Sequence, residues 1–174
     1  MADTDGEAST KPIYVIDTSA LIDLWLTYPH RTFEHLWERF AALAAAGRLV
    51  APEEVRHEIS RRDEHLKAWA SAADGLFRAP DDGFMTCLAR VVPECPYLTP
   101  LSRRYAADAW VVALALQIQD AEQGKMFGAP CYVVTHEQKV THPGKLKIPD
   151  ACDHFDLRYI RMVRIFDLEG WEGH

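Results

Sequence analysis

Four carboxylic acids stand where a predicted strand ends or along the predicted helices that follow: Asp17, Glu58, Asp108 and Glu137. Asp17 follows the apolar run 12–16, Asp108 precedes the apolar run 109–116, and Glu137 comes shortly after the apolar run 131–134. A buried carboxylate is costly unless it is paired or bound to a metal. Carboxylate oxygens are the ligands that hard cations such as Mg²⁺ and Mn²⁺ prefer. The four acids therefore predict a divalent-metal site.

Each acid also has a simpler structural explanation. Asp17 could cap the helix that follows it, and Asp108 could interact with the dipole of the helix that it opens. Glu58 could pair with an arginine one turn further along its helix, and Glu137 could be an exposed loop residue. We favour the metal role for all four because they recur at equivalent places in the chain.

The predicted elements would bring these acids together. We expect strands at 12–17, 49–51 and 131–135, a fourth strand or a last helix at 159–163, and helices at 20–26, 33–43, 52–59, 66–69, 84–91 and 104–123. Strands that alternate with helices are typical of an α/β fold with a parallel sheet. Ligands of such sheets bind beyond the carboxyl ends of the strands, at a topological switch point. Asp17 and Glu137 both lie just beyond such an end.

Length and composition indicate one soluble domain. The 174 residues contain 48% hydrophobic and 26% charged residues, which is ordinary for a globular domain. We expect a single domain at 12–170 after a disordered N-terminal arm at 1–11. No apolar run approaches the ~20 residues that span a bilayer, and the start lacks signal-peptide features, so we expect a cytoplasmic protein. The four cysteines show no metal-type spacing and predict buried, reduced thiols.

The charge pattern limits how the protein would bind nucleic acid. A formal net charge of −7 argues against binding through bulk positive charge, so contacts with phosphates require a local basic rim. The residues that we expect to contact substrate are Thr18, Ser19, Arg103, Arg104 and Lys139. Thr18, Ser19 and Thr135 could also hydrogen-bond a metal-bound water or fix Asp17, and plain capping of the next helix stays an equal alternative.

Two other kinds of site lack support in the sequence. His57 and His136 flank candidate ligands, but no tight His/Cys set of the kind that binds zinc stands out. The run 142–145 lacks the first glycine and the Ser or Thr of a P-loop.

Four segments resemble, in order, the acidic motifs of PIN-domain ribonucleases, the family of VapC-like toxins. They are Val15–Ile22, Val55–Ile59, Ala107–Ala115 and Val133–Glu137. At the last position the family more often has aspartate than the glutamate of this chain. The run Ile148–Cys152 also resembles the ending of a PIN-like branch. The resemblance implies a three-layer α/β/α sandwich with a mainly parallel sheet of four to five strands.

The resemblance also implies an activity: hydrolysis of RNA phosphodiester bonds with one or two Mg²⁺ or Mn²⁺ ions. Asp17, Glu58, Asp108 and Glu137 would be the metal ligands and catalytic residues. A divalent ion lowers the pKa of a water that it binds and stabilises charge on phosphoryl oxygens. The expected partners are an RNA substrate and the antitoxin protein of a toxin–antitoxin pair, with a homodimer left open. The alternatives are a catalytically silent interaction module and a related DNA-directed nuclease.

Overall fold

The sheet at the centre of the molecule has five strands, all parallel. The computed structural model describes residues 10–62, 64–100, 106–139 and 146–171. The strands are β1 (Ile13–Ile16), β2 (Leu49–Pro52), β3 (Phe77–Arg78), β4 (Cys131–Val134) and β5 (Arg158–Ile160). Their order is β3-β2-β1-β4-β5, and every neighbouring pair is parallel. The expected α/β fold with a parallel sheet is confirmed.

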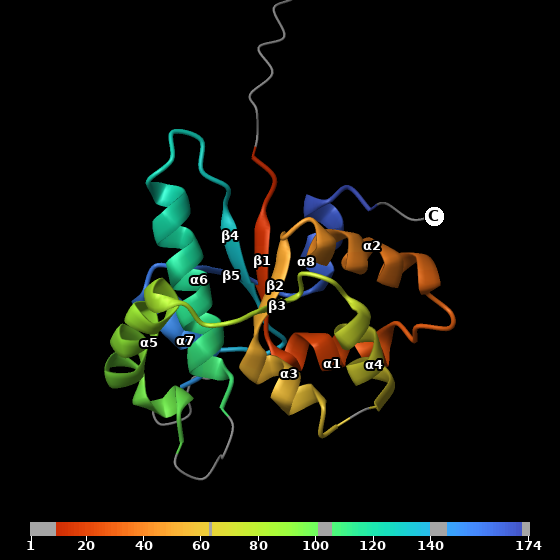
Figure 1. Ribbon diagram of the computed structural model, residues 1–174, viewed down its shortest axis with the longest axis horizontal. Coiled ribbons are helices and arrows are strands. Elements are labelled where there is room, and N and C mark those ends of the chain that lie inside the picture. The colour runs from red at the N-terminus through yellow and green to blue at the C-terminus, as the bar shows by residue number, and fades with distance from the viewer. Residues whose placement is uncertain (1–9, 63, 101–105, 140–145, 172–174) are drawn as a thin grey trace, which may run out of the picture.

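Helices cover both faces of this sheet (Figure 1), as in a three-layer α/β/α sandwich. They are α1 (Thr18–Thr27), α2 (Glu34–Ala45), α3 (Glu53–Ile59), α4 (Glu64–Ala72), α5 (Asp82–Glu94), α6 (Asp108–Gln123), α7 (Ile148–His154) and α8 (Val163–Leu168), with a 3₁₀ turn at Pro96–Leu98. In Figure 1, α5 and α6 lie to the left of the sheet, and α1, α2 and α8 lie to its right.

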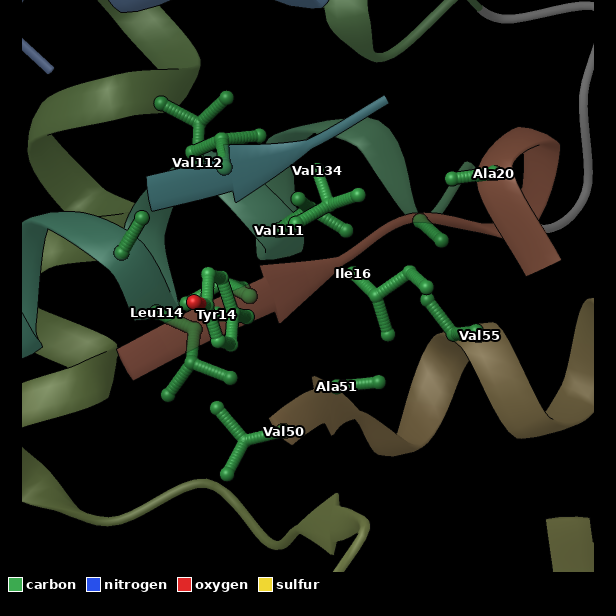
Figure 2. Close-up of a cluster of buried hydrophobic side chains, with 14 of the residues drawn as sticks. Tyr14, Ile16, Ala20, Val50, Ala51, Val55, Val111, Val112, Leu114 and Val134 are labelled. Carbon is green, nitrogen blue, oxygen red and sulfur yellow. The ribbon is translucent and has the colours of Figure 1, made fainter. Parts of the chain in front are cut away.

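The core is built around β1, the central strand. Tyr14, Val15 and Ile16 are fully buried, because a strand inside a parallel sheet is covered on both faces and must be apolar throughout. Figure 2 shows Ile16 between Val134 of β4 and Ala51 of β2. The helix that supports this strand is α6, whose residues 111–116 are all buried.

The element boundaries differ from expectation in several places, among them the following four. Neither Thr18 nor Ser19 caps α1; Asp17 does, through its carboxylate. Pro52 is the N-cap of α3 and not its first residue. The central helix begins at Asp108. The described residues 106–107, which we expected to be helical, lie before it. Pro93 lies inside the last turn of α5 and not in the following loop.

The C-terminal part of the described chain is joined to the sheet by a nearly buried ion pair. Arg48, just before β2, donates to both carboxylate oxygens of Glu169, and the bond from Nη1 to Oε2 is 2.8 Å long. The Tyr14 hydroxyl donates to the same carboxylate over 2.7 Å. The arginine and glutamate side chains are only 16% and 10% exposed. This contact fixes the residues after α8 against the amino ends of β1 and β2.

The thiol expectation is confirmed. Cys87, Cys95, Cys131 and Cys152 are buried and carry no disulfide. Burial raises the pKa of Cys131 to about 12, so its neutral form is strongly favoured. Across the part of the chain that the structure describes, none of the helices has the length and apolar character needed to cross a membrane.

Candidate active site

The four acids of interest line one cleft at the carboxyl edge of the sheet. The chain leaves β1 toward β2 on one side, while β4 lies on its other side, which makes this edge the topological switch point of the sheet. In Figure 1 the place is the lower end of the sheet, where α1, α3 and the start of α6 meet. A cleft of 370 Å³ opens there, lined by Asp17, Thr18, Ser19, Ile22, Asp23, Leu26, Glu58, Arg62, Asp108, His136 and Glu137.

Two larger hollows lie elsewhere and contain none of the four acids. They measure 560 and 540 Å³ and are lined by residues near the amino ends of the strands, such as Pro130 and Ile13. Their position is opposite to the edge at which parallel sheets bind ligands. The smaller cleft at the switch point is therefore the better candidate.

Asp17 is the most buried of the four acids, with only 3% of its surface exposed. Its carboxylate accepts hydrogen bonds from the Ala20 backbone N–H at 2.7 Å, the Thr135 hydroxyl at 2.7 Å and the Ser19 hydroxyl at 2.8 Å. Burial raises the pKa of Asp17 to about 6, although these hydrogen bonds oppose the rise; the nearby charge of Glu137 adds to it. The donors are neutral, so the ionised carboxylate has a strong preference for a cation.

The two hydroxyls that hold Asp17 also connect two elements of the cleft. Ser19 Oγ accepts from the His136 backbone N–H at 3.1 Å, and Thr135 Oγ1 accepts from the Glu137 N–H at 3.0 Å. The start of α1 and the end of β4 therefore share one hydrogen-bond network. The sequence left open whether Ser19 contacts substrate or a metal-bound water, fixes Asp17 or caps α1; in this network it fixes Asp17. Thr135 is almost fully buried. Its hydroxyl can be buried because it donates to Asp17 and accepts from the Glu137 N–H.

Glu58 connects α3 to the start of α6. Its Oε2 accepts from the Thr18 hydroxyl at 2.5 Å, and its Oε1 accepts from the Ala107 backbone N–H at 3.1 Å. The second bond satisfies a backbone donor next to the first turn of α6 and places the glutamate carboxylate beside Asp108. Thr18, which we expected at the substrate, thus orients a candidate ligand.

Glu137 reaches from the end of β4 to the start of α7. Its Oε2 accepts from the Ile148 backbone N–H at 3.2 Å, and its Oε1 lies 4.0 Å from Lys147 Nζ. It is therefore not a free loop residue. The glutamate side chain is long enough to span this gap. Nothing in the sequence pattern predicted the link to α7.

The predicted basic rim is only partly described by the structure. Lys139 forms an ion pair with Asp153, which raises the pKa of the lysine and neutralises part of its charge. It lines a hollow of 550 Å³ together with Ser19, His136, Glu137, Gln138 and Lys147. Because three of these residues also line the carboxylate cleft, the two spaces are adjacent. Arg103 and Arg104 lie outside the described residues.

Sequence reasoning missed the role of α1 in the cleft wall. Asp23 and Ile22 line the cleft, and Asp23 Oδ2 lies 3.1 Å from His136 Nδ1. The available signal was helical spacing, since Ile22 and Asp23 lie three and four positions after Ser19 and so share its face of α1. His136, which the sequence suggested only as a zinc ligand, instead lines both the carboxylate cleft and the adjacent hollow.

The donor chemistry of the cleft fits a hard divalent cation. The carboxylates and hydroxyls that line the cleft supply oxygen atoms, as Mg²⁺ and Mn²⁺ prefer; Arg62 and His136 line it as well. Among the residues that the structure describes, no three His, Cys, Asp or Glu side chains stand close enough to form a ready ligand set. Mg²⁺ typically takes one or two carboxylates directly and keeps several waters, so the donor set does not need such a trio.

Comparison with known proteins places the chain in a family. Residues 14–172 match the model of a domain of unknown function, DUF4411. The chain belongs to the DUF4411 family. The matched DUF4411 region contains all four acids, the network around Asp17, and the link from Glu137 to α7. A search of curated proteins found no match.

Proposed function

We propose that this protein is a Mg²⁺- or Mn²⁺-dependent endoribonuclease of the PIN type, and that it acts in the cytoplasm as the toxin of a toxin–antitoxin pair. The observation that carries the proposal is the meeting of Asp17, Glu58, Asp108 and Glu137 in one cleft at the switch point of a parallel sheet. These are the four acids of the segments that resemble the PIN motifs.

The four acids would have different roles in binding the cation. Asp17 is fixed by three donors and Asp108 starts the rigid central helix, so these two would set the geometry. Glu58 and Glu137 accept from backbone N–H groups and would act directly or through water. When bound, the ion supplies an activated water and stabilises charge on the phosphoryl oxygens of the substrate.

Charge balance supports a cationic ligand at this place. Four carboxylates around one cleft repel one another, and burial already raises the pKa of Asp17. A divalent ion would relieve both costs, since opposite charge stabilises ionised acids. The same ion would offset the local negative potential that opposes the approach of a phosphodiester.

The decisive experiment is a cleavage assay with structured RNA, unstructured RNA and single-stranded DNA across a Mn²⁺ series. We expect Mn²⁺-dependent cleavage of RNA by the wild type and none by Asp17→Asn or Asp108→Asn. The matched control is Asp120→Asn, which changes an exposed aspartate near the other end of α6. Wild-type cleavage by either cleft variant would exclude that residue as a ligand. Cleavage of DNA alone would favour the DNA-directed nuclease.

Toxicity is a separate test. Expression of the wild type should arrest growth of a bacterial host, and expression of Asp17→Asn should not. If a small reading frame adjoins the gene, its co-expression should restore growth when it encodes an antitoxin. Growth that is unaffected by active enzyme would remove the toxin role and leave the ribonuclease.

A second candidate, a catalytically silent interaction module, has two observations in its favour. Both glutamates of the cleft are already engaged by protein donors, and no ready ligand trio exists among the described residues. Calorimetric titration with Mn²⁺ separates the two functions. Binding that Asp17→Asn abolishes supports the nuclease, whereas absence of binding supports the silent module.

A further inference from the structure

A cluster of three charged or polar side chains lies at the carboxylate cleft, and two of them, Asp23 and His136, line it. Asp23 comes from α1, His136 from the residue pair after β4, and Arg161 from the residue after β5. His136 Nδ1 lies 3.1 Å from Asp23 Oδ2 and 3.3 Å from an Arg161 guanidinium nitrogen. Two charges of opposite sign therefore meet at one ring nitrogen.

No arrangement of the imidazole proton satisfies both neighbours. A protonated Nδ1 donates to Asp23 but cannot accept from Arg161, and an unprotonated Nδ1 accepts from Arg161 but offers Asp23 only a lone pair. The guanidinium has five N–H donors in a planar fork. At most part of this capacity is used at His136, and Arg161 is exposed to solvent.

The position of this cluster gives it a function. His136 lines both the carboxylate cleft and the adjacent hollow that contains Lys139 and Lys147. A chain that lies across the four acids and continues into that hollow must pass His136. The cluster stands at the junction of the two spaces.

We propose that Arg161, placed by His136, is a binding site for a backbone phosphate of the RNA strand next to the phosphate that is cleaved, and that Asp23 competes with the RNA for it. This inference rests on the proposed function and adds a subsite to it. Planar, always charged arginine is well suited to phosphate recognition. A phosphate would offer Arg161 several acceptors, where His136 offers one.

The competition by Asp23 follows from its position. Its carboxylate lies at the same ring nitrogen as the guanidinium, so it lowers the local positive potential when no substrate is present. This arrangement allows a protein of net charge −7 to bind RNA at one place without a broad basic surface. Binding through few phosphates predicts a shallow dependence of affinity on salt.

The test measures affinity without cleavage. A fluorescent single-stranded RNA dodecamer is titrated with full-length protein in Ca²⁺ or EDTA over a series of salt concentrations. Arg161→Ala should weaken binding by about three- to fivefold, the scale of one exposed charge contact. It should also reduce the slope of log K against log salt by about 0.7, the value for one phosphate of a single strand.

A double-mutant cycle tests the competition. Asp23→Asn should tighten binding in the wild-type background and have no effect in the background of Arg161→Ala. The matched control cycle uses Arg164→Ala and Asp167→Asn, an exposed ion pair in α8, close in sequence but outside the cleft. This control pair should change binding little and show no coupling.

Each outcome decides something. Equal affinity of the wild type and Arg161→Ala overturns the subsite, and equal tightening by Asp23→Asn in both backgrounds overturns the competition. If Arg161→Ala weakens binding but the wild type does not cleave RNA with Mn²⁺, the subsite stands and the proposed catalysis fails. If the wild type cleaves and Arg161→Ala binds and cleaves equally well, the catalysis stands and the subsite fails.

Discussion

Replacing Asp17 by asparagine should stabilise the metal-free protein while it abolishes activity. The rise in the pKa of Asp17 from its ordinary value of 3.8 to about 6 corresponds to about 3 kcal/mol at pH values above both. Because the folded state holds its proton more tightly than the unfolded state, this cost is absent at low pH. It develops as the pH rises from about 4 to about 6 and is constant above that range.

Asp17→Asn removes this cost, but the free energy of unfolding rises by less than the full amount. The amide oxygen can still accept from the Ala20 N–H, whereas the amide nitrogen faces the hydroxyls of Ser19 and Thr135, each of which already accepts a backbone hydrogen bond. We therefore expect a net gain of about 1 to 2 kcal/mol. For a domain of this size the gain raises Tm by about 2 to 8 °C.

The assay is thermal unfolding followed by circular dichroism in EDTA, at about pH 4 and about pH 7.5. The variant should exceed the wild type at the higher pH and approach it at the lower pH. Asp120→Asn is the control and should follow the wild type at both. Saturating Mn²⁺ should reverse the order, because a ligand that binds only the folded state stabilises it. A variant that is less stable than the wild type in EDTA at about pH 7.5 would refute the reasoning.

Three further outcomes are expected from the same structure. Glu137→Gln should lower cleavage more at limiting than at saturating Mn²⁺, because an outer ligand mainly sets ion affinity; rates that overlay the wild type at every Mn²⁺ concentration would remove this residue from the site. Thr135→Val deletes a donor to Asp17, so the pKa of that carboxyl should rise further and the acid limb of the pH–rate profile should move to higher pH. An unchanged acid limb would contradict this. Arg48→Met leaves a mostly buried carboxylate without its cation and should cost about 3 kcal/mol in urea unfolding, while a loss below about 0.5 kcal/mol would show that the pair is not stabilising.

The long elements were predictable because their sequence patterns are strong. The apolar β-branched runs of β1 and β4 and the long apolar helix α6 all occur where periodicity and composition place them. The strand β3 was not predicted, since two residues at the edge of a sheet carry no periodicity. Helix α7 was also missed, although Pro149 in its first turn and the bond from the Lys147 N–H to Asp150 are typical start signals.

The members of the candidate site were predictable, but not their local partners. Strand-to-helix junctions in a parallel sheet share one edge, so the positions of Asp17 and Glu137 were enough to expect a common cleft. The bond from Ile148 to Glu137 and the contact of Arg161 with His136 join residues that are 11 and 25 positions apart. Such contacts depend on how β4, β5 and α7 pack, which no local pattern encodes.

The central place of β1 has a consequence for how the protein is made. Its neighbour on one side, β2, follows within about forty residues by ordinary short-range chain folding, but β4, its neighbour on the other side, begins only at Cys131. During synthesis, one edge of this apolar strand therefore stays unpaired until most of the chain has been made. An unpaired apolar edge is a template for aggregation. The same delay keeps Thr135 from reaching Asp17, so a nascent chain would lack an assembled cleft until β4 and the residues that follow it have emerged.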